Sequence, residues 1–190
     1  TEQGVTICAP TANINHRGDT LGGINLTVKI TAPAPEVIRV QVAHHLGVQA
    51  KLPEFDLTFA EGFKPEITEN EEEVTVKSGS LALRIDRKNW SMRYERDGKL
   101  LTTSAGRDLG YMRTGWTGFA YDNDPNGKAF MRQQLGLSVN EHVYGLGERF
   151  GAFIKNGQSV DIWNEDGGTS TDQSYKNIPF YLTDKGYGVF

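Results

Sequence analysis

Residues 143–190 combine glycine, aromatic, acidic and amide side chains more densely than a simple strand-and-turn structure requires. The segment YGLGER (residues 144–149) places two glycines directly before the acid Glu148 and the cation Arg149. The segment WNEDGG (residues 163–168) is a polar loop that begins with an aromatic residue and ends with two glycines. Hydrogen-bonding groups beside an aromatic ring match the polar rim and apolar face of a sugar ring. The loop is therefore better suited to bind a sugar than to fill a core.

Carboxylates are numerous in the same region, and paired carboxylates are the groups that hydrolyse most glycosidic bonds. Retaining glycoside hydrolysis uses two carboxyl groups about 5 Å apart, one as the nucleophile and the other as an acid with a raised pKa. Such tuning needs burial and a paired neighbour. The sequence selects no such pair among its five candidates here, which are Glu148, Asp161, Glu165, Asp166 and Asp172.

The elements that must position these residues are short β-strands. Residues 24–30 and 37–42 alternate between apolar and polar side chains, as half-buried strands do. Further strands are predicted at residues 74–76, 80–85 and 90–95. Asp97-Gly98 is a strong signal for a tight hairpin turn. No helical period of apolar residues lasts longer than two turns, so the pattern predicts an all-β sandwich or barrel.

Composition limits the class of protein. A chain of 190 residues with 37% apolar residues and 22 glycines is long enough for one domain with a real core. The net charge of −4 and the scattered cations argue against a nucleic-acid partner. No apolar run approaches the roughly 18 residues that a membrane span needs, so no membrane partner is predicted.

Metal and redox chemistry find little support in the sequence. Cys8 is the single cysteine, which excludes a disulfide within the chain. The four histidines show no zinc-binding spacing, so no metal site is predicted. Asn25 and Asn89 each lie in an N-glycosylation acceptor pattern, which would matter only in a secreted protein. The compartment stays open between cytoplasmic, for a bacterial protein, and secreted, if these patterns are used.

Three segments carry a resemblance to a known family. They are YGLGERF (residues 144–150), WNEDGGTS followed by YKNIPFY (residues 163–181), and GYGV (residues 186–189). In these segments the chain closely resembles the N-terminal β-sandwich domain of glycoside hydrolase family 31, and within that family the α-xylosidases. The likeness fades to pattern alone over residues 57–140, and the first fifty residues carry no matching motif.

The resemblance implies an antiparallel β-sandwich of the galactose mutarotase-like supersandwich type. Residues 1–56 would supply lead-in strands, and residues 57–190 would form the sandwich with a substrate-rim loop at residues 161–177. The sandwich is expected to be incomplete at its C-terminal end. In the family both catalytic Asp residues lie on a (β/α)₈ barrel outside this chain, so we assign no catalytic residue here and expect the chain alone to be inactive.

The resemblance assigns a role to the loop and to Asp166, and the residue types suggest roles for the neighbouring side chains. Asp166 is expected to accept hydrogen bonds from substrate hydroxyls, with capping of the turn at Gly167 and Gly168 as the alternative. Trp163 and Asn164 are the other substrate-binding candidates, although a tryptophan such as Trp163 is more often part of a core. The expected supporting residues are Glu148, Arg149, Gly167, Gly168, Lys176 and Asn177, with an ion pair between Glu148 and Arg149 behind the loop. The sequence does not settle the isomer of the Ile178–Pro179 bond.

The expected function is that of a non-catalytic domain of a retaining α-glycosidase that releases terminal α-linked xylose from oligosaccharides, without metal or organic cofactor. Its partners would be the oligosaccharide and the catalytic barrel, on the same or a separate polypeptide, and a homo-oligomer is left open. Two alternatives remain: an α-glucosidase of the same family, and a free-standing carbohydrate-binding module. Mutarotase activity has only His142 and Glu148 in its favour, because nothing else of such a site is identifiable.

Overall fold

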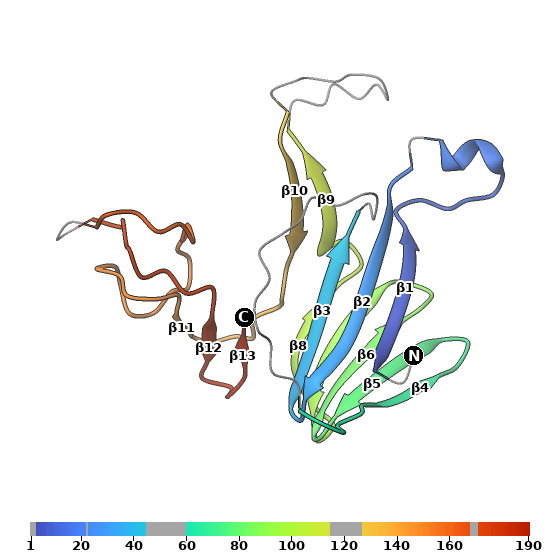
Figure 1. Cartoon of the computed structure of the whole chain (residues 1–190), viewed down its shortest axis with the longest axis horizontal. Helices are drawn as coiled ribbons and strands as arrows, with labels where there is room; N and C mark the ends of the chain where they lie inside the picture. The colour runs from blue at the N-terminus through green and yellow to red at the C-terminus, as the bar shows by residue number, and fades with distance from the viewer. Residues whose placement is uncertain (1–2, 22, 45–59, 115–126, 168–170) are drawn as a thin grey trace. The chain divides into compact units, whose positions relative to one another are not determined.

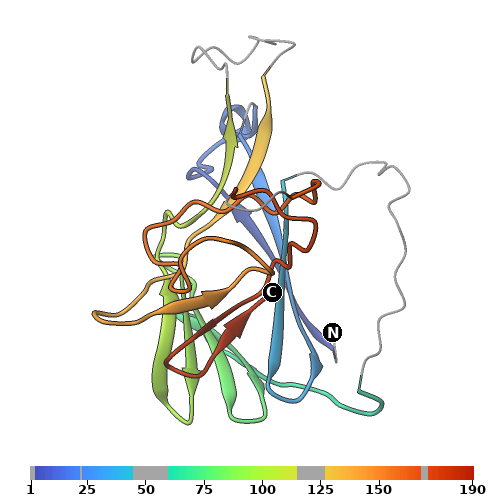
Figure 2. The same cartoon turned by 90° about the vertical axis from the view of Figure 1, so that its left-hand side faces the viewer.

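The computed structural model describes residues 3–21, 23–44, 60–114, 127–167 and 171–190, in two compact units, Thr1–Gly136 and Leu137–Phe190 (Figures 1 and 2). All strand pairings in the described residues are antiparallel. This confirms the predicted all-β antiparallel fold. Among the described residues no helix is long and apolar enough to cross a membrane.

Two sheets dominate the first unit (Figure 1). The smaller one has the order β1 (Gly4–Pro10), β2 (Asn25–Ala34) and β3 (Val37–Ala43). The larger one has the order β4 (Glu66–Glu69), β5 (Glu73–Ser78), β6 (Leu81–Asp86), β7 (Ser91–Arg96) and β8 (Lys99–Ser104). A 3₁₀ helix, η1 (Arg17–Thr20), lies between β1 and β2.

A hydrophobic core joins the two sheets. Alternate residues of β2 turn inward because successive side chains of a strand point to opposite faces. They pack against inward residues of β5, β6 and β7 in one cluster, which contains Leu26, Val28, Ile30, Val74, Val76, Leu83, Ile85, Met92 and Leu109. Burial of each large aliphatic side chain stabilises the fold by about 1.5–3 kcal/mol. The first unit is therefore a sandwich built on the alternation visible in the sequence.

The predicted strands and hairpin of this unit are confirmed. The expected segments correspond to β2, β3, β5, β6 and β7, each within a few residues. Asp97 and Gly98 have φ values of 49° and 75° between β7 and β8. Positive φ at both central residues is the geometry of the two-residue turn that suits the twist of paired strands. This turn fixes the pairing of Arg96 with Lys99.

A second hairpin-like pair was not predicted from the sequence. It consists of β9 (Leu109–Arg113) and β10 (Ala129–Gln133). Every residue of β10 is exposed, so the strand lacks the alternation that would reveal it. The pair is tied to the rest of the unit by Gln133, whose side-chain amide donates to Ser104 Oγ at 2.6 Å.

The second unit holds a small sheet and a long connection. The sheet has the order β11 (Val143–Gly145), β12 (Tyr181–Thr183) and β13 (Gly188–Val189). Residues 146–180 connect β11 to β12, and Figure 2 shows this connection as the orange and red trace. Its described residues contain no named strand or helix, and one isolated parallel bridge joins Asn164 to Ser174. All the predicted site residues lie on this connection, while the predicted boundary at residues 56 and 57 falls outside the described residues.

Candidate functional site

The connection begins where two backbone segments approach closely. Gly147 has a φ of 91°, and a Cβ at this position would lie 2.1 Å from the carbonyl oxygen of Lys176. The amide of Glu148 donates to that same carbonyl at 3.0 Å, and the amide of Leu146 donates to Phe180 at 2.9 Å. Glycine is required here because both the left-handed backbone and the missing side chain are used. The two ends of the connection are thereby held side by side.

Arg149 lies where several segments of the connection meet. Its Nε donates to the carbonyl oxygen of Leu146 at 3.3 Å, and its Nη1 donates to that of Asp172 at 3.0 Å. Its Nη2 donates to the carbonyl oxygen of Asp161 and to the side-chain oxygen of Asn177. The planar guanidinium has five N–H donors in a fixed fork, which allows one side chain to serve acceptors in different directions.

Asn177 continues this network through its amide group. Its Nδ2 donates to the carbonyl oxygens of Trp163 and Ser174, each at 2.6 Å. The Oδ1 of Asn164 accepts from the backbone amide of Asn177 at 3.0 Å and from its Nδ2 at 3.1 Å. Two of the predicted site residues, Asn164 and Asn177, are thus in direct contact. Asn164 supports the loop from within in this structure.

A second set of contacts holds the loop next to the returning chain. The amide of Glu165 donates to the carbonyl oxygen of Ser174 at 3.0 Å, and the Gln173 side chain donates to Glu165 Oε2 at 2.9 Å. A Cβ on Gly167 would lie 2.8 Å from the carbonyl oxygen of Gln173. Gly167 is therefore needed for this close approach. Gly168 lies outside the described residues.

Glu148 pairs with Lys176 rather than with Arg149. The two charged groups are 3.1 Å apart, and their side chains are 70% and 62% exposed. The expected ion pair between Glu148 and Arg149 is not found among the described residues, because the guanidinium is turned toward amide oxygens instead. Solvent screens an exposed pair of this kind, so its contribution to stability is small.

Asp166 and Trp163 are both exposed. The Trp163 side chain is 72% exposed, so it is not part of a core in this unit. Asp166 is also exposed, and its carboxylate makes no hydrogen bond with another described residue. The backbone carbonyl oxygen of Trp163 accepts a hydrogen bond from Asn177, so the backbone that carries the exposed indole ring is held in place. An exposed indole and an exposed carboxylate three residues apart can offer an apolar face and hydrogen-bond acceptors to a sugar.

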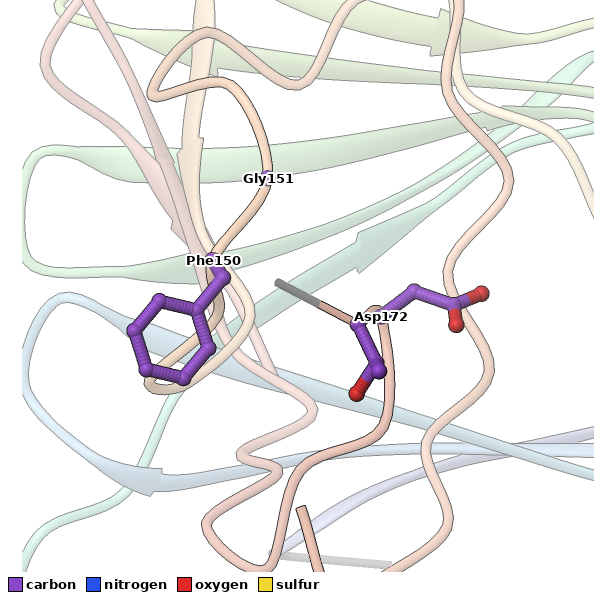
Figure 3. A pocket seen from close by; sticks show the side chains of 4 residues that line it. Phe150, Gly151 and Asp172 are labelled. Carbon is purple, nitrogen blue, oxygen red and sulfur yellow. The ribbon is translucent and has the colours of Figure 1, made fainter. Parts of the chain in front are cut away.

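Two hollows lie beside this loop. One is lined by Phe150, Gly151, Thr171 and Asp172 and has a volume of about 440 Å³. Figure 3 shows Phe150 and Asp172 on neighbouring segments of the connection. The other hollow, of about 530 Å³, is lined by Gly147, Glu148, Arg149, Phe150, Gly167, Gln173, Ser174, Tyr175 and Lys176. Asp166 and Trp163 line neither hollow, and among the described residues no acidic, histidine or cysteine cluster could hold a metal ion.

Charged groups just before β11 and just after β12 interact with one another. Burial raises the pKa of Glu141, but a hydrogen bond from the Ser138 amide, the nearby Tyr187 hydroxyl and the charge of Lys185 outweigh it and lower the pKa overall. A hydrogen bond from the His142 ring lowers the pKa of Asp184, and the two groups are 2.8 Å apart. The His142 ring is thus hydrogen-bonded to Asp184 and not to Glu148.

Ser174 is a supporting residue that the sequence did not reveal. Its side chain is buried, and its Oγ donates to the carbonyl oxygen of Glu148 at 2.6 Å. The same Oγ accepts from the amide of Lys176 at 3.1 Å. A serine between polar residues carries no signal of burial, so this role could not be read from the pattern. The Ile178–Pro179 bond is trans, since the described residues contain no cis peptide bond.

Comparison with known proteins identifies the family. The sequence matches the N-terminal galactose mutarotase-like domain of glycosyl hydrolase 31 over residues 27–190. It is 38% identical over 189 residues to the α-xylosidase XylQ of Lactiplantibacillus pentosus, a match that covers 98% of this chain. It is 40% identical over 188 residues to an α-xylosidase of Emericella nidulans, a match that covers 92% of this chain. The chain therefore belongs to the family of N-terminal galactose mutarotase-like domains of glycoside hydrolase family 31. It spans about a quarter of the length of these relatives, 23% and 24% respectively.

The fold is also similar to that of solved family members. A family 31 dextranase of Flavobacterium johnsoniae superposes with a TM-score of 0.66 at 16% identity, over 97% of this chain and 21% of that enzyme. At so low an identity the likeness concerns the fold alone. The galactose mutarotase-like fold that the sequence predicted is confirmed by the family match.

Proposed function

We propose that this chain is the N-terminal, non-catalytic domain of a retaining α-glycosidase that releases terminal α-linked xylose from oligosaccharides. The observation that carries the proposal is the 38% and 40% identity to two α-xylosidases over nearly the whole chain. The rest of the enzyme, about three quarters of its length in those relatives, would contain the catalytic barrel. The reaction would proceed by double displacement through a covalent glycosyl-enzyme.

The contribution of this domain is a binding loop at the rim of the active site. Asp166 is exposed, and its oxygens are not engaged by other described residues, so they are available to substrate hydroxyls. A carboxylate suits this task because its hydrogen bonds are charge-assisted and it offers several acceptor positions. Binding energy from sugar units that do not react can align the scissile bond, so a loop remote from the catalytic pair can still raise kcat.

Replacement of Asp166 by Ala in the full-length enzyme tests this role. We expect kcat/KM on an α-xylosyl oligosaccharide to fall by about tenfold to a hundredfold, which corresponds to about 1.4–3 kcal/mol for a lost charged hydrogen bond. The effect on an aryl α-xyloside should be small, because the aryl group lacks the hydroxyls that Asp166 would bind. An unchanged kcat/KM on the oligosaccharide would exclude the rim role.

The sugar specificity is tested on the same enzyme with two substrates. Turnover of an aryl α-xyloside well above that of the matching α-glucoside supports an α-xylosidase, and the reverse order supports the α-glucosidase alternative. A free-standing binding module would instead be isolated as a 21 kDa species that binds oligosaccharides without turnover. Size exclusion followed by mass identification of every polypeptide in the peak separates these cases.

A further inference from the structure

We propose that Arg149 and Asn177 are positioning residues that hold residues 161–167 in the geometry needed for sugar binding. This inference rests on the proposed function, and it identifies what keeps the exposed Asp166 in place. Neither residue is proposed to touch the substrate.

Arg149 and Asn177 bond both to residues 161–167 and to the returning chain that follows this loop. Arg149 bonds to the carbonyl oxygen of Asp161, where the loop begins, and to that of Asp172 on the returning chain. Asn177 bonds to Trp163 within the loop and to Ser174 on the returning chain. The two side chains also bond to each other. The loop that carries Asp166 is thus held on both sides by one pair of side chains.

The network depends on donor geometry and not on opposite charge. The four oxygen atoms that the Arg149 side chain contacts in the described residues belong to three backbone carbonyls and one side-chain amide. A lysine would preserve the charge but has three donors on a single nitrogen, which cannot reach acceptors in so many directions. The structure therefore predicts that Arg149→Lys is not a conservative change.

Asn177→Asp is a second substitution that tests the hydrogen-bond network. Asn177→Asp has nearly the same shape and preserves the oxygen that accepts from Arg149. It removes the Nδ2 donor, which serves the carbonyls of Trp163 and Ser174 and the Oδ1 of Asn164. The new carboxylate would face these oxygens without a proton between them, and such a contact is unfavourable. The variant thus breaks the support of the loop while it leaves the contact with Arg149 intact.

The exposed side chain of Gln158 supplies a matched control. It lies on the same connection, and its Nε2 donates to the backbone carbonyl oxygen of Ile154 at 2.6 Å, four residues earlier. Gln158→Ala removes this local hydrogen bond and leaves the Arg149–Asn177 network in place. We expect this variant to remain within about twofold of the parent enzyme, as is usual for surface substitutions.

The experiment is a double-mutant cycle in the full-length enzyme. Arg149→Lys, Asn177→Asp and Gln158→Ala are each measured alone and together with Asp166→Ala, on an α-xylosyl oligosaccharide and on an aryl α-xyloside. We expect Arg149→Lys and Asn177→Asp to lower kcat/KM on the oligosaccharide by about tenfold or more, because small errors in position are costly. Combined with Asp166→Ala, they should add less than about twofold, since the residue they position is then absent. The aryl substrate should be little affected.

Several outcomes would overturn the inference. A loss that multiplies fully with that of Asp166→Ala, or equal losses on both substrates, would indicate a general structural role. Unchanged kinetics in both Arg149→Lys and Asn177→Asp would exclude any role. If Asn177→Asp does not fold, Asn164→Ala removes one acceptor of the same network and takes its place in the cycle.

A readout independent of activity separates this inference from the proposed function. If Asp166→Ala has no effect on the oligosaccharide, the rim role fails, and hydrogen exchange of residues 161–167 then decides the positioning role. Exchange that is at least tenfold faster in Asn177→Asp but not in Gln158→Ala supports it. Equal exchange rates in the two variants would overturn it.

Discussion

Gly147 is the residue at which the second unit depends most on the absence of a side chain. Its φ of 91° disfavours any L-residue with a Cβ, and a Cβ would lie 2.1 Å from the Lys176 carbonyl oxygen. Gly157, in the same unit, has a φ of 72° with open space around the Cβ position. The pair therefore separates the cost of the backbone conformation from the cost of the clash.

We predict that Gly147→Ala is markedly more destabilising than Gly157→Ala. The left-handed conformation alone costs about 1–2 kcal/mol, and the clash adds about 1–3 kcal/mol at Gly147. Hydrogen exchange of the β11 and β12 amides in the full-length enzyme measures the local opening energy of this region. Similar effects of the two substitutions would show that the close approach at Gly147 relaxes freely.

Residue types in the loop were predictable, but their partners were not. The pattern identified Glu148, Arg149, Asn164 and Asn177 as polar groups of one site. It suggested an ion pair between the neighbours Glu148 and Arg149, whereas the guanidinium bonds to backbone carbonyl and side-chain amide oxygens up to 28 positions away. Glu148 follows a bend outside any strand, and both Glu148 and Arg149 bond to the returning chain, so proximity in sequence was a poor guide to contact.

At the scale of elements, alternation identified the strands that have one buried face. Leu83 and Leu100 show the contrast within one sheet: Leu83 is fully buried in the core cluster, and Leu100 is 48% exposed on β8. Alternation does not reveal β10, because a strand exposed on both faces needs no apolar period. β1 does alternate, with Val5, Ile7 and Ala9 against the core, and this signal could have been recognised.

We predict that Leu83→Ala costs about 2–5 kcal/mol of unfolding free energy, the usual range for a buried leucine. Leu100→Ala, the same chemical change on the same sheet, should cost less than about 0.5 kcal/mol. Chemical denaturation of the two variants, with the slope of the transition compared with that of the parent, provides the measurement. A small loss for Leu83→Ala would mean that the sandwich core rearranges to fill the space.

At the scale of the whole molecule, the chain is one part of a larger enzyme in its relatives, of which it spans 23% and 24%. The second unit exposes several large apolar side chains, among them Phe153 at 79%, Trp163 at 72% and Phe190 at 88%. Exposed apolar groups on this scale are characteristic of surfaces that bind ligands or other parts of a protein. We expect the remainder of the enzyme to cover some of them and the substrate to contact others.

We predict that residues 1–190 alone have no glycosidase activity, because the catalytic carboxylate pair lies on the proposed barrel. The full-length enzyme should hydrolyse an aryl α-xyloside under the same conditions. Assays of both proteins at equal molar concentration test this expectation. Turnover by residues 1–190 that persists through repeated purification would place a catalytic pair in this chain and contradict the proposal.

Sequence alone determined the all-β class, the main strands of the sandwich, the tight turn at Asp97-Gly98 and the family, because alternation and local motifs are encoded by neighbouring residues. The tertiary structure decided which groups hold residues 161–167 in place. Arg149 bonds to Asp172, 23 positions away, and Ser174 bonds to Glu148, 26 positions away. Asn177 bonds to Trp163, 14 positions away. Irregular backbone has no period from which contacts can be read, and its hydrogen bonds are satisfied only when distant segments meet.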